Sequence, residues 1–419
     1  MMTKIKDDCF VAGGGSMKLD QALALLKERL KTVTGDETVR LGDALGRVLA
    51  ADVIAGRDVP PHDNSAMDGY AVFFDDLATN GETRLPVAGY IAAGHPLGAP
   101  ALRGNAYRIF TGAPMPEGPD TVFMQENCAT DGDDVILEPG IDRGANRRRR
   151  GEDIAAGSVI LRQGRRLRPQ EIALAASVGR PTLTVCKRLR TAVFSTGDEV
   201  RDPSDNAPEG CIYDANRYAV MGLLKDLGCA VTDLGILPDN QRIIRDALDN
   251  AAKDHDVVIT SGGVSLGDED HVKAAVEELG GLYFWRLAVK PGRPIALGRV
   301  ADAVFIGLPG NPVSAMVTFM RVARPVLLLL SGHNRIDPPL FKVRAGFGFD
   351  KEPGRREWLR ARLTKDKDGV LTAVKHHLGG SGILTSMADA DGLVELPEDQ
   401  GAVAEGDMVD FLPFSEVTA

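Results

Sequence analysis

The sequence predicts a multidomain α/β plus β protein with a doubly wound, mostly parallel α/β domain. Two observations predict this fold class. From Arg190 to about Ser331, apolar runs of strand length alternate with helix-length amphipathic segments, which is the pattern of a parallel sheet with crossover helices. On both sides of that stretch, short β-like runs alternate with turns rich in Pro and Gly. A chain of 419 residues has room for three or four domains.

The α/β stretch contains four expected strands and four expected helices. Asp214 is expected to cap the first helix, which carries Leu223, Leu224 and Leu227 on one face and stops at Gly228. The expected strands are 191–194, 229–237, 257–260 and 303–306, and the later helices are 242–252, 271–279 and one that begins at Pro312.

The flanking regions divide into further units. Ser16 is expected to cap a helix whose leucines at 19, 23, 26 and 30 lie on one face, after a loose tail of fifteen residues. Residues 50–150 predict a β-rich lobe, and Gln170–Ser177 predicts a helix. After residue 337 the expected strands are 340–349, 357–364, 370–376, 392–396 and 408–413, which suit a small barrel or sandwich.

Composition excludes several function classes. A formal net charge of −10 and a pI near 5.3 argue against a nucleic-acid binder. Five scattered cysteines without a CxxC pair argue against a disulfide framework and a structural zinc site. The first sixteen residues lack the apolar core of a signal peptide, and the longest apolar run, Val326–Leu330, is too short to cross a bilayer. We therefore expect a cytoplasmic protein that does not bind membranes.

Three loops that follow predicted strands are rich in glycine. In a parallel sheet such loops lie at one edge, where helix N-termini present free N–H groups to anions. Each loop alone is equally typical of an ordinary strand-to-helix turn, but three together predict a phosphate-bearing ligand. The loops are 195–199, 261–270 and 307–314.

The same region is rich in charged residues. Carboxylates beside a phosphate site suggest Mg²⁺, with Glu199 and Asp270 favoured as ligands, although helix capping explains acidic residues near Asp270 equally well. The stiff turn Lys290–Pro294, with Arg286 before it, presents cations, unless it is only a solvated hairpin. The run Arg147–Arg150 is either a solvated face or an entry point for an oxyanion.

Six motifs in order give the chain a resemblance to a known family. The segments are Asp63–Ala71, Phe110–Pro116, Arg148–Asp153, Ser195–Glu199, Ser261–Ser265 and Gly307–Pro312. Together they closely resemble the molybdopterin molybdenumtransferase (MoeA) family, from about residue 16 to the C-terminus.

The resemblance implies a homodimer of elongated, four-domain subunits. The implied domains are a split N-terminal domain (16–62 and 151–187), a β-rich inserted domain (63–150), an α/β molybdopterin-binding domain (188–336) and a C-terminal β-barrel (337–419). The active site would lie between the α/β domain of one subunit and the inserted domain of the other. The implied reaction takes adenylylated molybdopterin and molybdate and yields molybdenum cofactor and AMP, in contact with other proteins of the same biosynthesis.

The resemblance also assigns site residues. The implied catalytic residues are Asp68, Thr111, Glu199, Asp239, Asp270 and Lys290, with Glu199 and Asp270 as Mg²⁺ ligands. The expected substrate-binding residues are Arg148, Ser195, Thr196, Gly197, Ser261, Gly262, Gly263, Arg286, Arg293, Pro309, Gly310, Asn311 and Pro312. Arg286 stands where relatives often have lysine, and the two side chains are not equivalent donors.

The residues suit that chemistry. Molybdate is a tetrahedral dianion, which the cations Lys290 and Arg293 and the N–H groups of glycine loops can hold. Mg²⁺ can offset the charge of the leaving adenylate. Asp68 is expected to orient or protonate an oxide of molybdenum, or to hold a cation.

Two other functions remain alternatives. Related single-domain proteins share the α/β core and adenylylate molybdopterin with ATP, but such an enzyme would not need the N-terminal 180 residues. A non-catalytic dimeric scaffold is the second alternative, since some eukaryotic relatives use the equivalent module to bind receptor loops. Here no long linker or partner domain is fused and the site residues are present.

Overall fold

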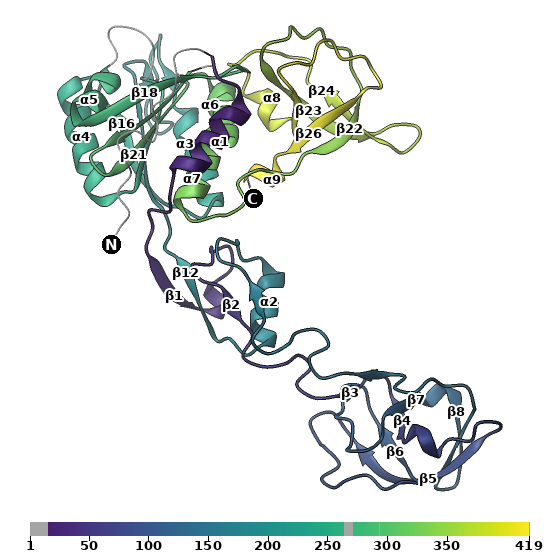
Figure 1. The fold of residues 1–419 in the computed structure, drawn as a ribbon. Coiled ribbons are helices and arrows are strands. Elements are labelled where there is room, and N and C mark those ends of the chain that lie inside the picture. Colours follow the sequence, from purple (N-terminus) through teal and green to yellow (C-terminus); the bar gives the residue numbers. More distant parts are fainter. Residues whose placement is uncertain (1–15, 264–270, 293, 419) are drawn as a thin grey trace.

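The computed structural model describes residues 16–263, 271–292 and 294–418, and its chain is elongated (Figure 1). The α/β sheet and the C-terminal barrel lie together at one end. A β-rich domain forms the other end, and a small domain lies between them.

A six-stranded sheet forms the α/β domain. Its order is β16 (Ala230–Leu237), β13 (Arg190–Thr196), β17 (Val257–Ser261), β21 (Ala303–Leu308), β20 (Pro294–Val300) and β18 (Gly280–Arg286). Strands β16, β13, β17 and β21 are parallel, and β20 is antiparallel to both of its neighbours. The strand β18 therefore runs with the first four, and the predicted mostly parallel sheet is confirmed.

Helices cover both faces of this sheet because neighbouring strand residues point to opposite sides. Val193 packs in the core that contains α3 (Ala215–Asp226), α6 (Pro312–Thr318) and α7 (Arg324–Leu330). Ala192 and Phe194 pack instead in the core that contains α4 (Gln241–Asp254) and α5 (His271–Leu279). The predicted cap is confirmed, since the Asp214 carboxylate accepts a hydrogen bond from the backbone N–H of Arg217.

The first helix corrects two expectations. Helix α1 (Leu19–Arg29) has Lys18 at its N-cap position rather than Ser16, and Leu30 is its C-cap. Its buried leucines pack in the same core as α3 and α7, beside the α/β sheet (Figure 1). The expected N-terminal domain began at residue 16, whereas this helix packs with the α/β domain because its apolar face is buried there.

The small domain between the two ends contains short paired strands and one helix. Strand β1 (Asp36–Arg40) pairs with β12 (Thr182–Cys186), β2 (Val53–Ile54) pairs with β11 (Val159–Leu161), and α2 (Pro169–Ser177) packs beside them. We call this unit the middle domain.

The β-rich domain is entered through the pair β3 (Asn64–Ser65) and β10 (Arg147–Arg148). Its sheet has the order β7 (Thr121–Met124), β4 (Gly69–Val72), β6 (Ala106–Ile109), β5 (Thr83–Ile91), β9 (Asp134–Leu137) and β8 (Cys128–Asp131).

The C-terminal strands form a barrel, as predicted. They are β22 (Phe341–Ala345), β23 (Arg356–Lys365), β24 (Leu371–Lys375), β25 (Gly392–Leu396) and β26 (Met408–Pro413). Pairing between β23 and β25 closes the ring. Strand β19 (Val289–Lys290), which precedes β20 in the chain, pairs with β23 and joins the barrel to the α/β domain.

A helical stretch from Pro312 to Leu330 is apolar and long enough to cross a membrane by length and composition. However, 83% of it is buried inside the protein, which is typical of a core helix.

Candidate functional site

The ends of three parallel strands lie side by side. Ser195 of β13 pairs with Ser261 of β17, which pairs with Leu308 of β21, so the three glycine loops begin at the same level of the sheet. The loops also touch: a Cβ built on Gly310 would lie 3.8 Å from the Cα of Gly262. One on Gly262 would lie 3.8 Å from the carbonyl oxygen of Thr196. The structure therefore brings Ser195, Thr196, Ser261, Gly262 and Gly310 together, as the sequence predicted.

Asn216 of α3 ties these loops and was missed by the sequence analysis. Its Nδ2 donates to Ser261 Oγ at 2.9 Å and to the carbonyl oxygen of Gly310 at 2.7 Å. Ser261 Oγ in turn donates to the carbonyl oxygen of Pro309 at 3.0 Å. The only sequence signal was its position two residues after the capping Asp214. Through these bonds, Asn216 fixes the spacing between the loop after β17 and the loop after β21.

Two hydroxyl groups at the end of β13 are unsatisfied. Ser195 and Thr196 are 2% and 5% exposed, and neither hydroxyl has a hydrogen-bond partner in the part of the chain that the structure describes. A buried polar group without a partner costs free energy. A ligand with acceptor or donor oxygens above β13 would remove that cost.

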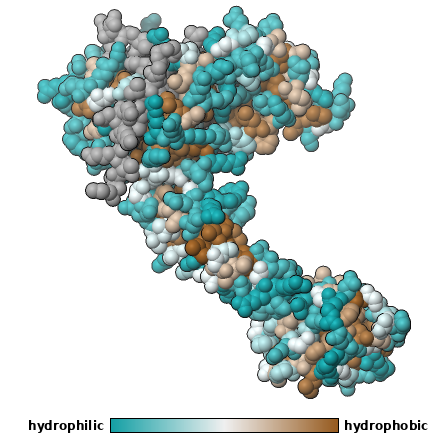
Figure 2. Space-filling view, viewed as in Figure 1, coloured by the Kyte–Doolittle hydropathy of each residue, from teal (hydrophilic) through white to brown (hydrophobic). Residues whose placement is uncertain are grey.

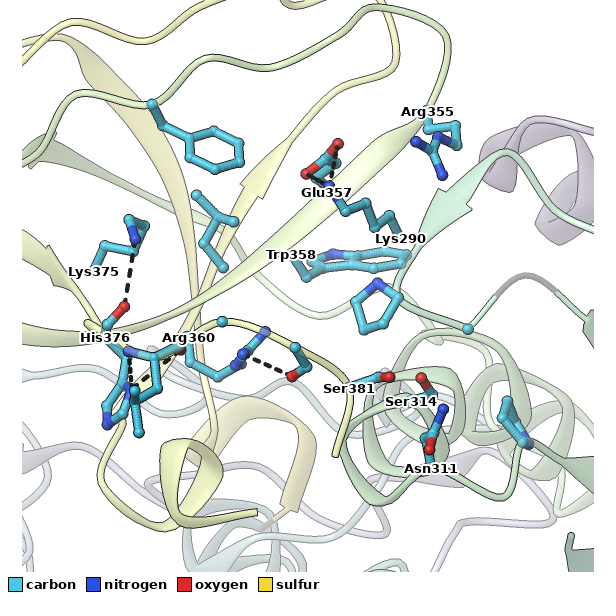
Figure 3. A pocket seen from close by; sticks show the side chains of 18 of the residues that line it. Lys290, Asn311, Ser314, Arg355, Glu357, Trp358, Arg360, Lys375, His376 and Ser381 are labelled. Atoms are coloured by element: carbon cyan, nitrogen blue, oxygen red, sulfur yellow. Dashed lines mark hydrogen bonds and ion pairs between the residues drawn. The ribbon is translucent and has the colours of Figure 1, made fainter. Parts of the chain in front are cut away.

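A cavity of about 770 Å³ lies between the α/β domain and the barrel (Figure 3). Pro309, Gly310 and Asn311 line it from the sheet edge, and Arg360 and Ser381 line it from the barrel. Its size suits a cofactor-sized ligand. The barrel's part in this cavity was not predicted, because no local pattern links these strands to the loops of a distant sheet.

Lys290 lines this cavity from β19. Its Nζ lies 3.2 Å from an oxygen of the buried Glu357 on β23, while its side chain stays 53% exposed. Gly292, with φ of +89°, packs so closely on α6 that a Cβ there would lie 2.2 Å from Thr318 Oγ1. The turn therefore holds Lys290 in place, which favours the presented cation over a solvated hairpin.

Arg360 is a buried cation in the wall of the cavity. It is 8% exposed, and it donates to Ser386 Oγ at 3.0 Å and to the carbonyl oxygen of Gly380 at 3.1 Å. Burial lowers the pKa of this guanidinium. No carboxylate pairs with it among the described residues, so its charge is available to an anion.

The remaining predicted residues of the α/β domain lie around the same edge. Glu199 is exposed on the loop after β13, next to Gly197, and its carboxylate pairs with no other residue that the structure describes. Asp239 follows β16 and lines a separate cavity with His271, the first residue of α5. Arg286 ends β18 at this edge but does not line the main cavity. Asp270 and Arg293 lie outside the described residues.

Pro312 occupies the first position of α6, as the sequence predicted, and Asn311 is the N-cap residue. The loop therefore leads into a helix N-terminus beside the cavity. One N–H group there is already paired, since Val313 N–H donates to the carbonyl oxygen of Ser381 at 3.0 Å. Gly263 ends the described part of its loop.

Asp68 and Thr111 form a second cluster in the β-rich domain. Asp68 Oδ1 accepts hydrogen bonds from the backbone N–H of Thr111 at 2.8 Å and from its hydroxyl at 2.7 Å. The N–H bond, followed by the hydroxyl bond, holds the pKa of Asp68 below its usual value. Arg148 lies on β10 opposite Asn64. This cluster and the α/β sheet lie at opposite ends of the elongated chain (Figure 1).

The Arg147–Arg150 run is largely paired. Arg147 Nε lies 3.4 Å from Asp63 Oδ2, and Arg150 Nε lies 2.5 Å from Asp58 Oδ2. Arg148 is exposed and is not in an ion pair with any residue the structure describes. Only part of this run is therefore free to meet an oxyanion.

The acidic residues fit a substrate-bridged cation better than a protein cage. No group of three or more His, Cys, Asp or Glu gathers at a metal-binding spacing within the described segments. Mg²⁺ commonly uses one or two carboxylates and completes its shell with water and substrate phosphates. The unpaired, exposed carboxylate of Glu199 suits that coordination.

Family models match the β-rich and middle domains, the α/β domain and the C-terminal barrel in turn. Family models match residues 17–179 as "MoeA N-terminal region (domain I and II)", residues 192–328 as "Probable molybdopterin binding domain" and residues 342–414 as "MoeA C-terminal region (domain IV)".

Individual relatives match almost end to end. The molybdopterin molybdenumtransferase of Haemophilus influenzae is 38% identical over 96% of this chain and 99% of its own length. Molybdopterin molybdenumtransferase 2 of Mycobacterium tuberculosis is 37% identical over 88% of this chain and 93% of its own length. A crystal structure of the MoeA protein of Pyrococcus horikoshii OT3 is 28% identical with a TM-score of 0.81, covering 95% of this chain and 99% of that one. The chain belongs to the MoeA family.

Proposed function

We propose that the protein is a molybdopterin molybdenumtransferase, which inserts molybdate-derived molybdenum into adenylylated molybdopterin and releases AMP. The observation that carries the proposal is the meeting of three glycine loops at one sheet edge, where the third loop lines a cavity that Lys290 and Arg360 also line. Such a site offers N–H groups to a pyrophosphate and, beside it, cations to a tetrahedral dianion.

In this proposal, the loops at Gly197, Gly262 and Gly310 hold the pyrophosphate of the substrate. Ser195, Thr196 and Ser261 supply hydroxyl groups beside it, and the first two are those left without partners. Lys290, Arg293, Arg286 and Arg360 hold molybdate. Pro309, Asn311 and Pro312 fix the shape of the loop between the two ligands.

The bond that breaks is the phosphoanhydride: water attacks the phosphorus on the molybdopterin side, the bond from that phosphorus to the bridging oxygen breaks, and AMP leaves with that oxygen while the attacking water gives up its protons. The two dithiolene sulfurs of the substrate replace two oxides of molybdate, and each departing oxide takes up two protons, from the thiols and from solvent, and leaves as water. Mg²⁺, held by Glu199 and Asp270, would offset the charge on the leaving phosphate. Asp239 would orient substrate groups beside β16, the outermost strand of this sheet edge.

The second cluster completes the site from another subunit. Asp68 and Thr111 belong to the β-rich domain, which lies at the opposite end of the elongated protein from the α/β sheet of the same subunit (Figure 1). A homodimer in which the β-rich domain of one copy, with Arg148, covers the cavity of the other would bring them there. Figure 2 shows apolar side chains at the surface of the middle domain, where Leu45, Ile54 and Val159 are exposed. An exposed apolar patch favours a subunit contact.

The test is a reconstitution with adenylylated molybdopterin, Mg²⁺ and molybdate, in which AMP release is measured. Molybdate-dependent release of AMP is expected, and parallel samples with tungstate give the oxyanion preference, since the two ions share charge and geometry. Samples with molybdopterin and ATP test the adenylyltransferase alternative. Adenylylated product without molybdate, or the absence of any turnover, would overturn the proposal. In the cell we place this reaction in the cytoplasm, next to the enzyme that supplies the adenylylated substrate.

A further inference from the structure

A second basic cavity, of about 540 Å³, lies where the middle domain, the α/β domain and the C-terminal helix α9 (Ser415–Thr418) meet. It does not share any lining residue with the cavity at Lys290. Its lining holds two carboxylates, Asp337 and Glu416, against a larger set of arginines. These are Arg162, Arg165, Arg166, Arg168, Arg324 and Arg335.

Pairing inside the protein cancels only part of this charge. Arg162 pairs with Asp52 at 3.0 Å. Arg165 and Arg168 share one carboxylate, that of Glu171, at 2.5 and 2.8 Å. Asp337 is itself paired with Lys27, at 2.6 Å. The arginines therefore remain in excess in an otherwise acidic protein.

The Arg324 side chain gives the strongest evidence that this cavity binds a ligand. It is half-buried, and its Nη1 and Nη2 donate to the carbonyl oxygens of Ile336 and Glu416 at 3.1 and 3.2 Å. Its Nε is buried and makes no hydrogen bond in the described part of the chain. Burial, followed by the charge of Arg321 and Arg166, lowers the pKa of Arg324 to about 10.

His333, also in the lining, reports the same positive field. Burial, followed by the charges of Arg166 and Arg324, lowers its pKa to about 4. The imidazole is therefore neutral at physiological pH because burial and, secondly, the neighbouring arginines oppose its protonation. Clustered arginines also repel one another, and a bound anion offsets that repulsion.

The walls of the cavity are fixed in place. Asn334 N–H donates to the carbonyl oxygen of Gly164 at 3.0 Å, and Asn334 Nδ2 donates to that of Gln163 at 3.2 Å. A Cβ on Gly164 would lie 2.9 Å from that of Asn334, so the two segments touch closely. Arg166 Nη2 donates to the carbonyl oxygen of Asp226 at 3.0 Å, at the end of α3. The arginines of the middle domain are thus presented towards those of the α/β domain.

We propose that this arginine cavity binds an anion with two or more phosphate-type charges, which bridges the middle domain and the α/β domain. Guanidinium groups suit this chemistry because their paired N–H donors match phosphate oxygens. The space exceeds that of one phosphate, so a diphosphate group fits the cavity better than a single one. Binding would restrict motion between the two domains. This inference does not depend on the proposed catalytic activity.

The test is calorimetric titration of the full-length protein with inorganic pyrophosphate and, separately, inorganic phosphate, at constant ionic strength. The cavity variant is Arg166→Gln combined with Arg335→Gln. Lys290→Gln weakens anion binding at the other cavity, and Arg57→Gln removes an exposed arginine that lines neither cavity. Two pyrophosphate sites are expected in the wild-type protein, one at the glycine loops and one at the arginine cavity. The cavity variant should show one site fewer, or one site weakened about tenfold or more, whereas Arg57→Gln should keep both sites and Lys290→Gln should keep the site at the arginine cavity.

Amide hydrogen exchange locates the site independently of affinity. Pyrophosphate should protect residues 163–168 and 333–337 in the wild-type protein. If the double variant does not fold, the single variant Arg335→Gln, which changes an exposed residue, takes its place in both measurements. The same number of pyrophosphate sites with the same affinities in a folded cavity variant and in the wild-type protein, or protection only around Lys290 and Gly310, would overturn the proposal. So would binding only at near-molar pyrophosphate.

Discussion

Asp68 Oδ1 accepts two hydrogen bonds from one residue, Thr111, through its backbone N–H at 2.8 Å and its hydroxyl at 2.7 Å. The pair joins the segment before β4 to the loop after β6, so two separate motifs of the sequence act as one unit. The two bonds keep the Asp68 carboxylate ionised and fix its orientation. The pair lies in the β-rich domain, at the end of the elongated protein farthest from the α/β sheet.

Replacing Thr111 by valine removes the hydroxyl donor and leaves the backbone bond. We expect the pKa of Asp68 to rise towards its ordinary value, because one of the two bonds that favour the carboxylate is lost. The acid limb of the pH–activity profile should therefore move to higher pH, with a loss of activity of roughly tenfold to a hundredfold. Thr111→Ser, which keeps the hydroxyl, is the control. An unshifted profile in Thr111→Val would show that the hydroxyl bond does not tune Asp68.

Chelation by EDTA should abolish AMP release, and Mg²⁺ should restore it. Glu199→Gln should raise the Mg²⁺ concentration for half-maximal activity by roughly tenfold to a hundredfold, because a ligand carboxylate is lost. Asp198→Asn changes the neighbouring exposed carboxylate and is the matched control. An equal Mg²⁺ requirement in Glu199→Gln and the wild-type protein would remove Glu199 from the metal site.

Arg217 is a buried hub in the α/β domain. Its side chain is 3% exposed and forms ion pairs with Asp202, Asp214 and Asp233. Arg217→Leu should lower the free energy of unfolding by about 3 to 5 kcal/mol, because it leaves the buried carboxylate of Asp214 unpaired. Lys253→Gln, which breaks an exposed pair with Asp249, should change it by less than about 0.5 kcal/mol. Chemical denaturation monitored by circular dichroism compares the two, and equal effects would contradict the buried-hub interpretation.

Glu171 couples stability of the middle domain to acid pH. The Arg168 side chain is the largest of the effects that lower the pKa of Glu171 to about 2, against burial, which raises it. Because the folded-state pKa is depressed, the stabilisation is complete above about pH 4.5 and is lost as the pH falls towards 2. It amounts to about 3 kcal/mol. In Glu171→Gln, the stability of this domain should be lower at neutral pH and nearly flat between pH 4.5 and 2. A slope like that of the wild-type protein would exclude Glu171 as the titrating group.

Much of the α/β domain followed from sequence because strand and helix periodicities are local. The apolar runs at 257–260 and 303–306, the cap at Asp214 and the glycine loops all appear where the local pattern put them. Helix α1 was assigned to the wrong neighbour because its apolar face has no preference between two cores that lie far apart in the chain. The observed strand ends differ from the expected ends by a few residues because the ends of helices and strands fray.

The candidate site was only partly predictable. The loop residues were found because glycine and proline have local conformational signatures. Asn216 and Arg360 were missed, because their roles arise from contacts with Ser261, Gly310 and Gly380 that only the folded chain creates. The roles of Asp68 and Thr111 came from family resemblance, since their turn alone predicts no chemistry.

The most direct test of the shared site is complementation between Asp68→Asn and Glu199→Gln, assayed at a Mg²⁺ concentration too low for Glu199→Gln alone to be active. Each is carried on a differently tagged chain, and the heterodimer is purified through both tags. A site built from two copies leaves one intact site in each heterodimer, so about half of the wild-type rate of molybdate-dependent AMP release should return. If each site used Asp68 and Glu199 from the same chain, both sites of the heterodimer would carry a lesion. A heterodimer as inactive as its parents would contradict the shared site.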